Sequence, residues 1–333
     1  MALLDSVSCR IINELQSGFP LSSAPFLEVA HQLDLTETAL IQHIEKLLSG
    51  GYLTRFGPLF NAEKMGGGLT LAALSVPKER LDEVAERVNL FPEVAHNYAR
   101  EHLLNMWFVL ATETKEEIQQ VIDQIESATN LQVFNLPKLT EYRLGFKLAL
   151  HKDGSIDTVP FNNIEQPFER ESTLSPTAQD RAIVTATQAG LPLLPSPFNA
   201  IAQQLGLTLE TVLNRFETML KQGWVRRIGV VPNHYQLGLR SNGMSVWHLP
   251  LDKIDHYGKQ IGALPFVSHC YRRPQKLPEW PYNLFTMVHG QDRSVVSERV
   301  ESISQLLGED DLDHTILYSS RILKKTGLRL KRE

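Results

Sequence analysis

The strongest constraint on this chain is an internal repeat. The stretch from Gln16 to Gly66 matches the stretch from Gln188 to Gly238 without a gap, at a constant offset of 172 residues. A match of this length between two parts of one chain indicates duplicated structural units. The 333 residues therefore predict two copies of one unit rather than a single large domain.

Each copy reads as two domains. In the first copy, apolar residues recur at helical spacing on both sides of a break at Thr36, the second helix ends at Gly50, and a strand-like run covers Tyr52 to Phe60. This order predicts a winged helix-turn-helix domain. Strand and helix patterns then follow in the order βαββαβ, which predicts a ferredoxin-like domain with a hairpin at 93–112 and a last strand near 142–150.

The predicted fold class is therefore α+β: a tandem repeat of winged helix-turn-helix and ferredoxin-like domains, pseudo-dimeric within one chain. A polar, Pro-containing stretch at 151–172 is the predicted linker between the copies. The predicted boundaries are 1–62 and 173–234 for the winged helix-turn-helix domains, and 63–150 and 235–333 for the ferredoxin-like domains.

Composition excludes several classes of protein. The formal net charge of −5 provides no overall basic field for nucleic acid. No apolar run approaches the roughly 20 residues of a membrane-spanning helix, and the first residues lack the pattern of a secretory signal. Cys9 and Cys270 are the two cysteines, so neither a disulfide framework nor a cysteine-based zinc site is expected. We expect a cytoplasmic protein.

A second repeated motif, Val-x-His-x-Tyr-x-Arg, carries the chemistry. Its residues are His96, Tyr98 and Arg100 in the first copy, and His269, Tyr271 and Arg273 in the second. Because side chains alternate along a strand, the three residues of each motif should share one face. Arginine binds carboxylates, histidine exchanges protons near neutral pH, and tyrosine adds a hydroxyl donor. The alternative is a structural role, since duplication copies structural residues as readily as catalytic ones.

The two copies differ beside this motif. The hairpin turn of the first copy carries His102, as either a site residue or a solvated loop residue. The hairpin of the second copy is five residues longer and carries Lys276 and Trp280, which could cover a flat ligand or only decorate the loop. The difference predicts that the two sites are not equivalent, and it favours the second copy.

The order of domains resembles the Lrp/AsnC family. The segments "FPEVAHNYAREHLLNMWFVLATET" and "LPFVSHCYRRPQKLPEWPYNLFTMVHG" narrow the resemblance to siroheme decarboxylases, with both homologous halves fused in one chain. The resemblance covers the chain except the linker. It implies loss of two acetate carboxyls of siroheme as CO2 to give 12,18-didecarboxysiroheme, on a route to haem d1 or haem. The alternatives are a ligand-responsive transcription regulator and a tetrapyrrole carrier without catalytic activity.

The resemblance also implies roles for residues. His96 and His269 are the expected proton donors, or alternatively ligands of the siroheme iron. The reaction needs no metal or cofactor of the protein's own, because the macrocycle itself can accept the electrons that CO2 leaves behind. No motif for such a group is visible in the sequence. The expected partners are siroheme, a further copy of the chain and other enzymes of haem d1 biosynthesis, with no membrane. The expected substrate contacts are Tyr98, Arg100, His102, Trp107, Tyr271, Arg272, Arg273, Lys276 and Trp280.

The two helix-turn-helix domains are poorly equipped to bind DNA. The first candidate recognition helix carries Lys46, and the second carries Arg215 and Lys221, each beside glutamates. One or two cations fall short of the roughly six to ten phosphate contacts that such proteins make. We expect no DNA binding, and a role for these helices in folding and packing.

Overall fold

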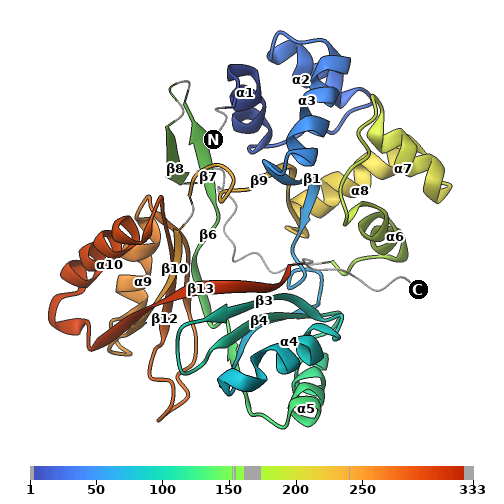
Figure 1. Ribbon diagram of the computed structural model, residues 1–333. Coiled ribbons are helices and arrows are strands. Elements are labelled where there is room, and N and C mark those ends of the chain that lie inside the picture. The colour runs from blue at the N-terminus through green and yellow to red at the C-terminus, as the bar shows by residue number, and fades with distance from the viewer. Residues whose placement is uncertain (1–3, 152, 154, 161–173, 240, 326–333) are drawn as a thin grey trace. The chain divides into compact units, whose positions relative to one another are not determined.

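The computed structural model describes residues 4–151, 153, 155–160, 174–239 and 241–325 (Figure 1). The chain divides into two compact units, and each unit combines segments from both copies of the repeat. Of the described residues, those within 4–65 and 147–238 belong to unit 1, and those within 66–146 and 239–325 belong to unit 2. The two helix-turn-helix domains therefore share unit 1, and the two ferredoxin-like domains share unit 2. Among the described residues, no helix is both long and apolar enough to cross a membrane.

Unit 1 contains two equivalent sets of three helices. Thr36 caps the third helix of the first copy by accepting a hydrogen bond from the backbone of Ala39, and Thr208 does the same for Thr211 in the second copy. The predicted helix-turn-helix units are confirmed. The helices are α1 (Ser6–Leu15), α2 (Pro25–Gln32), α3 (Glu37–Ser49), α6 (Ala178–Thr187), α7 (Pro197–Leu205) and α8 (Leu209–Lys221).

The strand after each helix-turn-helix pairs with its counterpart in the other copy. β1 (Leu53–Phe60) and β9 (Val225–Pro232) form an antiparallel ladder in which Gly57 lies opposite Gly229. Each of these strands therefore finds its hydrogen-bond partners across the repeat.

A second hairpin of unit 1 lies where a ferredoxin-like strand and the linker were expected. It consists of β7 (Phe146–Leu150) and β8 (Ile156–Pro160). The side-chain amide of Gln16, the C-cap residue of α1, accepts from the N–H and donates to the carbonyl of Leu148, at 2.9 Å each. β8 falls within the predicted linker, of which residues 152, 154 and 161–172 lie outside the described residues.

Unit 2 contains two βαββαβ motifs, which confirms the ferredoxin-like order. Two short 3₁₀ helices, at Lys78–Arg80 and Gly308–Asp310, accompany them. In the first copy the elements are β2 (Gly68–Leu74), α4 (Leu81–Asn89), β3 (Val94–Arg100), β4 (Met106–Thr112), α5 (Glu117–Thr129) and β5 (Val133–Pro137). In the second they are β10 (Ser241–His248), α9 (Ile254–Ala263), β11 (Val267–Arg272), β12 (Leu284–Gly290), α10 (Arg293–Leu307) and β13 (Asp313–Lys325).

The described strands of unit 2 join into one nine-stranded sheet of order β5-β2-β4-β3-β13-β10-β12-β11-β6. The first part of β13 pairs with β10 of its own copy, and the second part pairs with β3 of the other copy. In the opposite direction, β6 (Thr140–Leu144) leaves the first copy and pairs with β11 of the second. The predicted last strand near 142–150 is therefore corrected: the fourth strand of the first copy is β5, and β6 extends the other copy.

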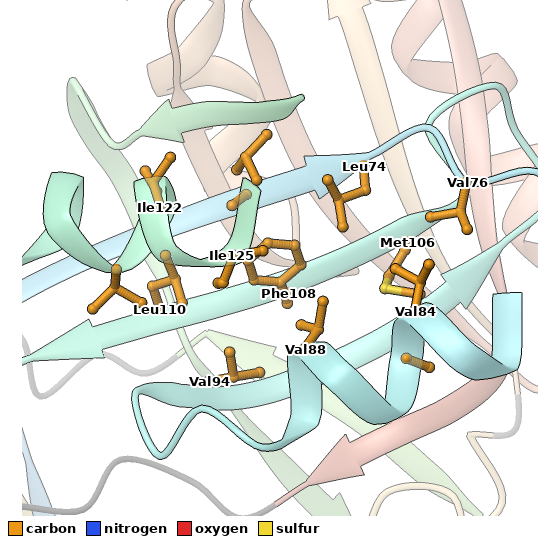
Figure 2. Packing of buried hydrophobic residues seen from close by; sticks show 14 residues of the cluster. Leu74, Val76, Val84, Val88, Val94, Met106, Phe108, Leu110, Ile122 and Ile125 are labelled. Atoms are coloured by element: carbon orange, nitrogen blue, oxygen red, sulfur yellow. The ribbon is translucent and has the colours of Figure 1, made fainter. Parts of the chain in front are cut away.

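The helices of unit 2 cover one face of each copy's strands (Figure 1). Figure 2 shows the core beneath α4 and α5, where Val88 and Ile125 lie around Phe108 of β4. An equivalent core beneath α9 and α10 contains Trp247 and Val300. We call the opposite side of the strands the helix-free face. It carries a third core, the central cluster, which consists of Ala73, Leu104, Trp107, Phe134, Leu136, Met244, Val246, Trp280, Tyr282, Phe285 and Leu317.

Candidate functional site

Alternation along β3 and β11 places both His-Tyr-Arg motifs on the helix-free face. Between the motif residues, Asn97 is fully buried and bonds to Asn89 of α4, while Cys270 packs in the core beneath α9. The motif histidines and tyrosines therefore point to the other side. Their ring centroids lie 6.3 Å apart for His96 and Tyr98. They lie 5.9 Å apart for His269 and Tyr271.

Each motif arginine is held by the other copy. Arg100 donates a hydrogen bond to the carbonyl of Leu317 in β13, and Arg273 donates to the carbonyl of Leu136 in β5. Both guanidinium groups also lie near the motif tyrosines, at 5.9 Å from the Tyr98 ring centroid in the first copy. The corresponding distance in the second copy is 5.2 Å. The two motifs are thus built alike, and each depends on a strand from the opposite copy for the position of its cation.

The neighbouring strands make the two sites different. Beside Tyr271, β6 brings in Glu141, which binds Lys138 at 2.8 Å. The Lys138 ammonium lies 5.9 Å from the centroid of the Tyr271 ring. The corresponding neighbour of Tyr98 is Ile322 of β13. The second site therefore has a further cation, and sequence reasoning missed Lys138 and Glu141 because they come from the first copy.

Of the residues expected to contact substrate, Arg272 lies on the other side of the strands, and two tryptophans are buried within the helix-free face. Arg272 projects to the helix side, where it pairs with Asp255 of α9 at 3.6 Å, so it does not share the face of His269. Trp107 and Trp280 are 1% and 0% exposed and pack with ring centroids 5.0 Å apart in the central cluster. Trp280, which was expected either to cover a flat ligand or to decorate the loop, is instead a buried member of the central cluster in this structure.

The remaining loop residues are placed as follows. Lys276 is exposed, and its backbone pairs with that of Trp280 through two hydrogen bonds of 2.8 Å. His102 accepts a hydrogen bond from the Leu104 backbone at 3.1 Å through Nδ1, and its ring meets Trp280 edge-on at 5.5 Å. Burial lowers the pKa of His102 and so favours its neutral form. His102 therefore contacts the longer hairpin of the other copy.

A hydrogen-bonded chain of three buried side chains adjoins His269. Nδ1 of His269 lies 2.7 Å from Oγ of Ser268, which lies 2.5 Å from Nε2 of His289. Nδ1 of His289 in turn contacts Oδ1 of Asn242 on β10. Sequence reasoning missed these three residues. A comparison of the two copies at these three positions shows polar side chains in the second copy only.

The described residues contain no group of three or more histidine, cysteine or acidic side chains that could hold a metal ion. In unit 1, Arg215 on the candidate recognition helix α8 is bound by the fully buried carboxylate of Asp180. Burial raises the pKa of Asp180, but hydrogen bonds from Arg215 and Thr177 outweigh it and hold the pKa below its ordinary value. Arg215, one of the cations of α8, is thus engaged in an ion pair within unit 1.

Comparison with protein families identifies both kinds of domain. The AsnC-like ligand-binding domain matches residues 64–143 and 236–324. The helix-turn-helix domain of siroheme decarboxylases of the NirDL type matches residues 8–53 and 180–226. Both domains are therefore present twice, in the order that the repeat predicts.

Individual relatives agree with this assignment. Siroheme decarboxylase of Hydrogenobacter thermophilus is 31% identical over 332 residues, which cover 96% of this chain and 93% of the relative. The NirH subunit of siroheme decarboxylase from Paracoccus pantotrophus is 50% identical over 157 residues, which cover 47% of this chain and 98% of the subunit. A crystal structure of the siroheme decarboxylase NirDL with an iron-uroporphyrin III analogue superposes with a TM-score of 0.71 at 28% identity, over 97% of this chain and 93% of that one. The chain belongs to the siroheme decarboxylase family, with both homologous halves fused.

Proposed function

We propose that this protein is a carboxy-lyase that removes two acetate carboxyls of siroheme as CO2 and yields 12,18-didecarboxysiroheme. The observation that carries the proposal is a His-Tyr-Arg motif on the helix-free face of each copy in a chain of this family. The relative that was solved with an iron-uroporphyrin III analogue supports a tetrapyrrole substrate. The haem d1 or haem route is the one in which such a product is used.

Substrate binding follows from the charges at the second site. Siroheme presents eight carboxylates, and the cations on or beside this face are Arg273 and Lys138. The planar guanidinium of Arg273 can engage a carboxylate with two parallel hydrogen bonds. The half-buried Tyr271 offers a hydroxyl donor and a flat ring between these cations. Arg100 with Tyr98 is the equivalent pair in the first copy.

Decarboxylation then needs one proton per carboxyl. The bond between the acetate methylene and the carboxyl carbon breaks, and its electron pair passes into the conjugated macrocycle. The pair returns to the former methylene carbon when that carbon takes up a proton and becomes a methyl group, so each decarboxylation consumes one proton and releases one CO2. We assign the proton donation to His269 or His96, a contribution of about 10²- to 10⁴-fold for a positioned acid. The balance requires no external oxidant or reductant, and we propose no cofactor of the protein's own.

Association with further chains is the second part of the proposal. Several half-length relatives carry the name of a subunit of siroheme decarboxylase, and each matches less than half of this chain. Such naming supports assembly of this chain with another copy or with other enzymes of the same route. Light scattering of the purified protein, alone and with such an enzyme, measures the mass of the assembly and so tests this association.

The test of the activity is anaerobic incubation of the purified protein with siroheme, followed by mass analysis of the extracted tetrapyrrole. Loss of two CO2 units supports the proposal. Siroheme that is bound but unaltered would instead identify a carrier, and absence of binding would return the regulator to consideration. The matched variants are His269→Ala and His96→Ala: binding should persist, and turnover should fall at least about tenfold where the histidine acts as the acid. Normal turnover in both variants contradicts the assignment.

A further inference from the structure

We infer that Ser268, His289 and Asn242 are positioning residues that hold His269 in one tautomer, so that the second copy contains the reacting histidine. The inference rests on the proposed function for its kinetic consequence. Its structural part, the tautomer of His269, is independent of the activity.

The direction of the hydrogen bonds follows from the far end of the chain of side chains. Asn242 turns its carbonyl oxygen Oδ1 toward Nδ1 of His289, and in this orientation of the amide the oxygen accepts and Nδ1 of His289 donates. A neutral imidazole with a proton on Nδ1 carries its lone pair on Nε2, which therefore accepts from the hydroxyl of Ser268. The Ser268 oxygen, having used its own proton, accepts from Nδ1 of His269 at 2.7 Å. His269 is thereby held as the Nδ1–H tautomer, and Nε2 is the ring atom that gains and releases a proton.

Burial makes this arrangement rigid. Ser268 is 1% exposed and His289 is 4% exposed, so water does not compete readily for their hydrogen bonds. The carbonyl of His289 also accepts from Arg299 of α10, which anchors the strand at that point. A histidine that is oriented by a second group in this way presents one fixed nitrogen to its reaction partner.

The first copy lacks the chemistry for the same arrangement. Strand register makes Ala95 the counterpart of Ser268, because both lie at the irregularity between Val and His of the motif. By the same registers, Ala111 corresponds to His289 and Leu69 to Asn242. Alanine and leucine side chains have no hydrogen-bonding atoms, so these three positions cannot fix the tautomer of His96. The duplication has kept the motif in both copies and its support in one.

The structural test is NMR spectroscopy of the full-length protein labelled with ¹⁵N-histidine, using long-range ¹H–¹⁵N correlations to read each tautomer. The His269 signals are identified by their loss in His269→Gln. We expect Nδ1–H at His269 in the wild type, and a mixture of tautomers in Ser268→Ala, which installs the residue that the first copy carries. The same mixture in the wild type, or an Nε2–H tautomer there, overturns the inference.

The kinetic test compares kcat and KM for siroheme among Ser268→Ala, His289→Ala and Asn242→Leu, each of which copies the first half. We expect kcat to fall by about 10- to 100-fold while KM stays within about twofold, as for the loss of a group that orients a histidine. Ser268→Thr, which keeps the hydroxyl, should restore most of kcat, and Ala95→Ser in the first copy should change neither constant. Thermal unfolding midpoints near that of the wild type establish that the variants are folded.

The outcomes separate the two proposals. Unchanged kcat in all three variants, or a rise in KM alone, overturns the positioning role. A wild-type protein that binds siroheme without releasing CO2 overturns the proposed activity instead, and the tautomer comparison then decides the positioning role by itself.

Discussion

Two tryptophans at the centre of unit 2 should respond very differently to the same substitution. Trp107 and Trp280 are both buried and lie 5.0 Å apart, but only one of their indole N–H groups is satisfied. Nε1 of Trp107 donates to the carbonyl of Leu104 at 2.6 Å. In the described part of the chain, Nε1 of Trp280 is buried without an acceptor. Replacement of each by phenylalanine therefore compares a bonded with an unbonded N–H in one environment.

The magnitude follows from this difference. Both substitutions remove the same volume from the central cluster, so that cost largely cancels between them. Trp107→Phe also loses a hydrogen bond worth about 0.5 to 1.5 kcal/mol, whereas Trp280→Phe removes a buried unsatisfied donor that costs about 1 to 3 kcal/mol. We expect Trp107→Phe to lower the free energy of unfolding by about 2 kcal/mol more than Trp280→Phe does. Trp280→Ala, which deletes the whole ring, should cost about 3 to 5 kcal/mol.

The assay is hydrogen exchange of peptides from β4 and β12 under native conditions, with urea unfolding followed by circular dichroism as a second measure. Exchange reports on unit 2 separately, which matters because the two compact units of the chain can unfold in separate transitions. If Trp280→Phe destabilises these strands as much as Trp107→Phe does, the reasoning from the unsatisfied N–H is refuted.

Two further predictions concern the fold. Asp180→Asn should cost about 3 kcal/mol at pH 7, because it leaves the Arg215 charge without its buried partner. Since the pKa of Asp180 is lowered in the folded state, this stabilisation is present above the ordinary carboxyl pKa of about 3.9 and is lost as the pH falls through the folded value. The difference between the urea midpoints of wild type and variant should therefore become smaller below pH 4. A difference that grows there would contradict the ion pair. Gly258→Ala should cost about 1 to 3 kcal/mol, because its Cβ would lie 2.3 Å from the ring of Tyr142 on β6. Gly262→Ala, with its nearest contact at 3.2 Å, is the milder control, and exchange of the β6 peptide should rank the two in that order.

Local sequence patterns predicted most of the helices and strands of this fold, but they did not predict which strands pair between the two copies. Helix caps at Thr36 and Thr208 and the alternation along β3 are properties of a few consecutive residues, so the helix-turn-helix units and the shared face of His96, Tyr98 and Arg100 could be predicted. The exchange of β6 between copies involves residues far apart in the chain. Nothing in the sequence from Thr140 to Leu144 distinguishes a strand that pairs within its copy from one that pairs outside it.

The same limit explains what was missed and misplaced at the candidate site. Lys138 reaches Tyr271 only because β6 crosses to the other copy. Trp280 looked like a loop residue for a ligand to contact, yet it is buried because the central cluster draws residues from both copies. His289 lies among apolar residues on the strand after the motif, so it did not stand out as a site residue. The one signal for it is that its counterpart in the first copy is Ala111.

The crossing of β13 and β6 also bears on how such a chain can evolve. Each copy completes the sheet of the other, so a separate half that folded in the same way would expose β3 or β11 as an edge that a partner chain has to cover. Fusion supplies that partner at a fixed ratio of one to one and at high local concentration. Under those conditions one half can lose its polar side chains without losing its role, because it still contributes a strand and a core to its neighbour. Division of labour between two unlike halves is the outcome that such an exchange of strands permits.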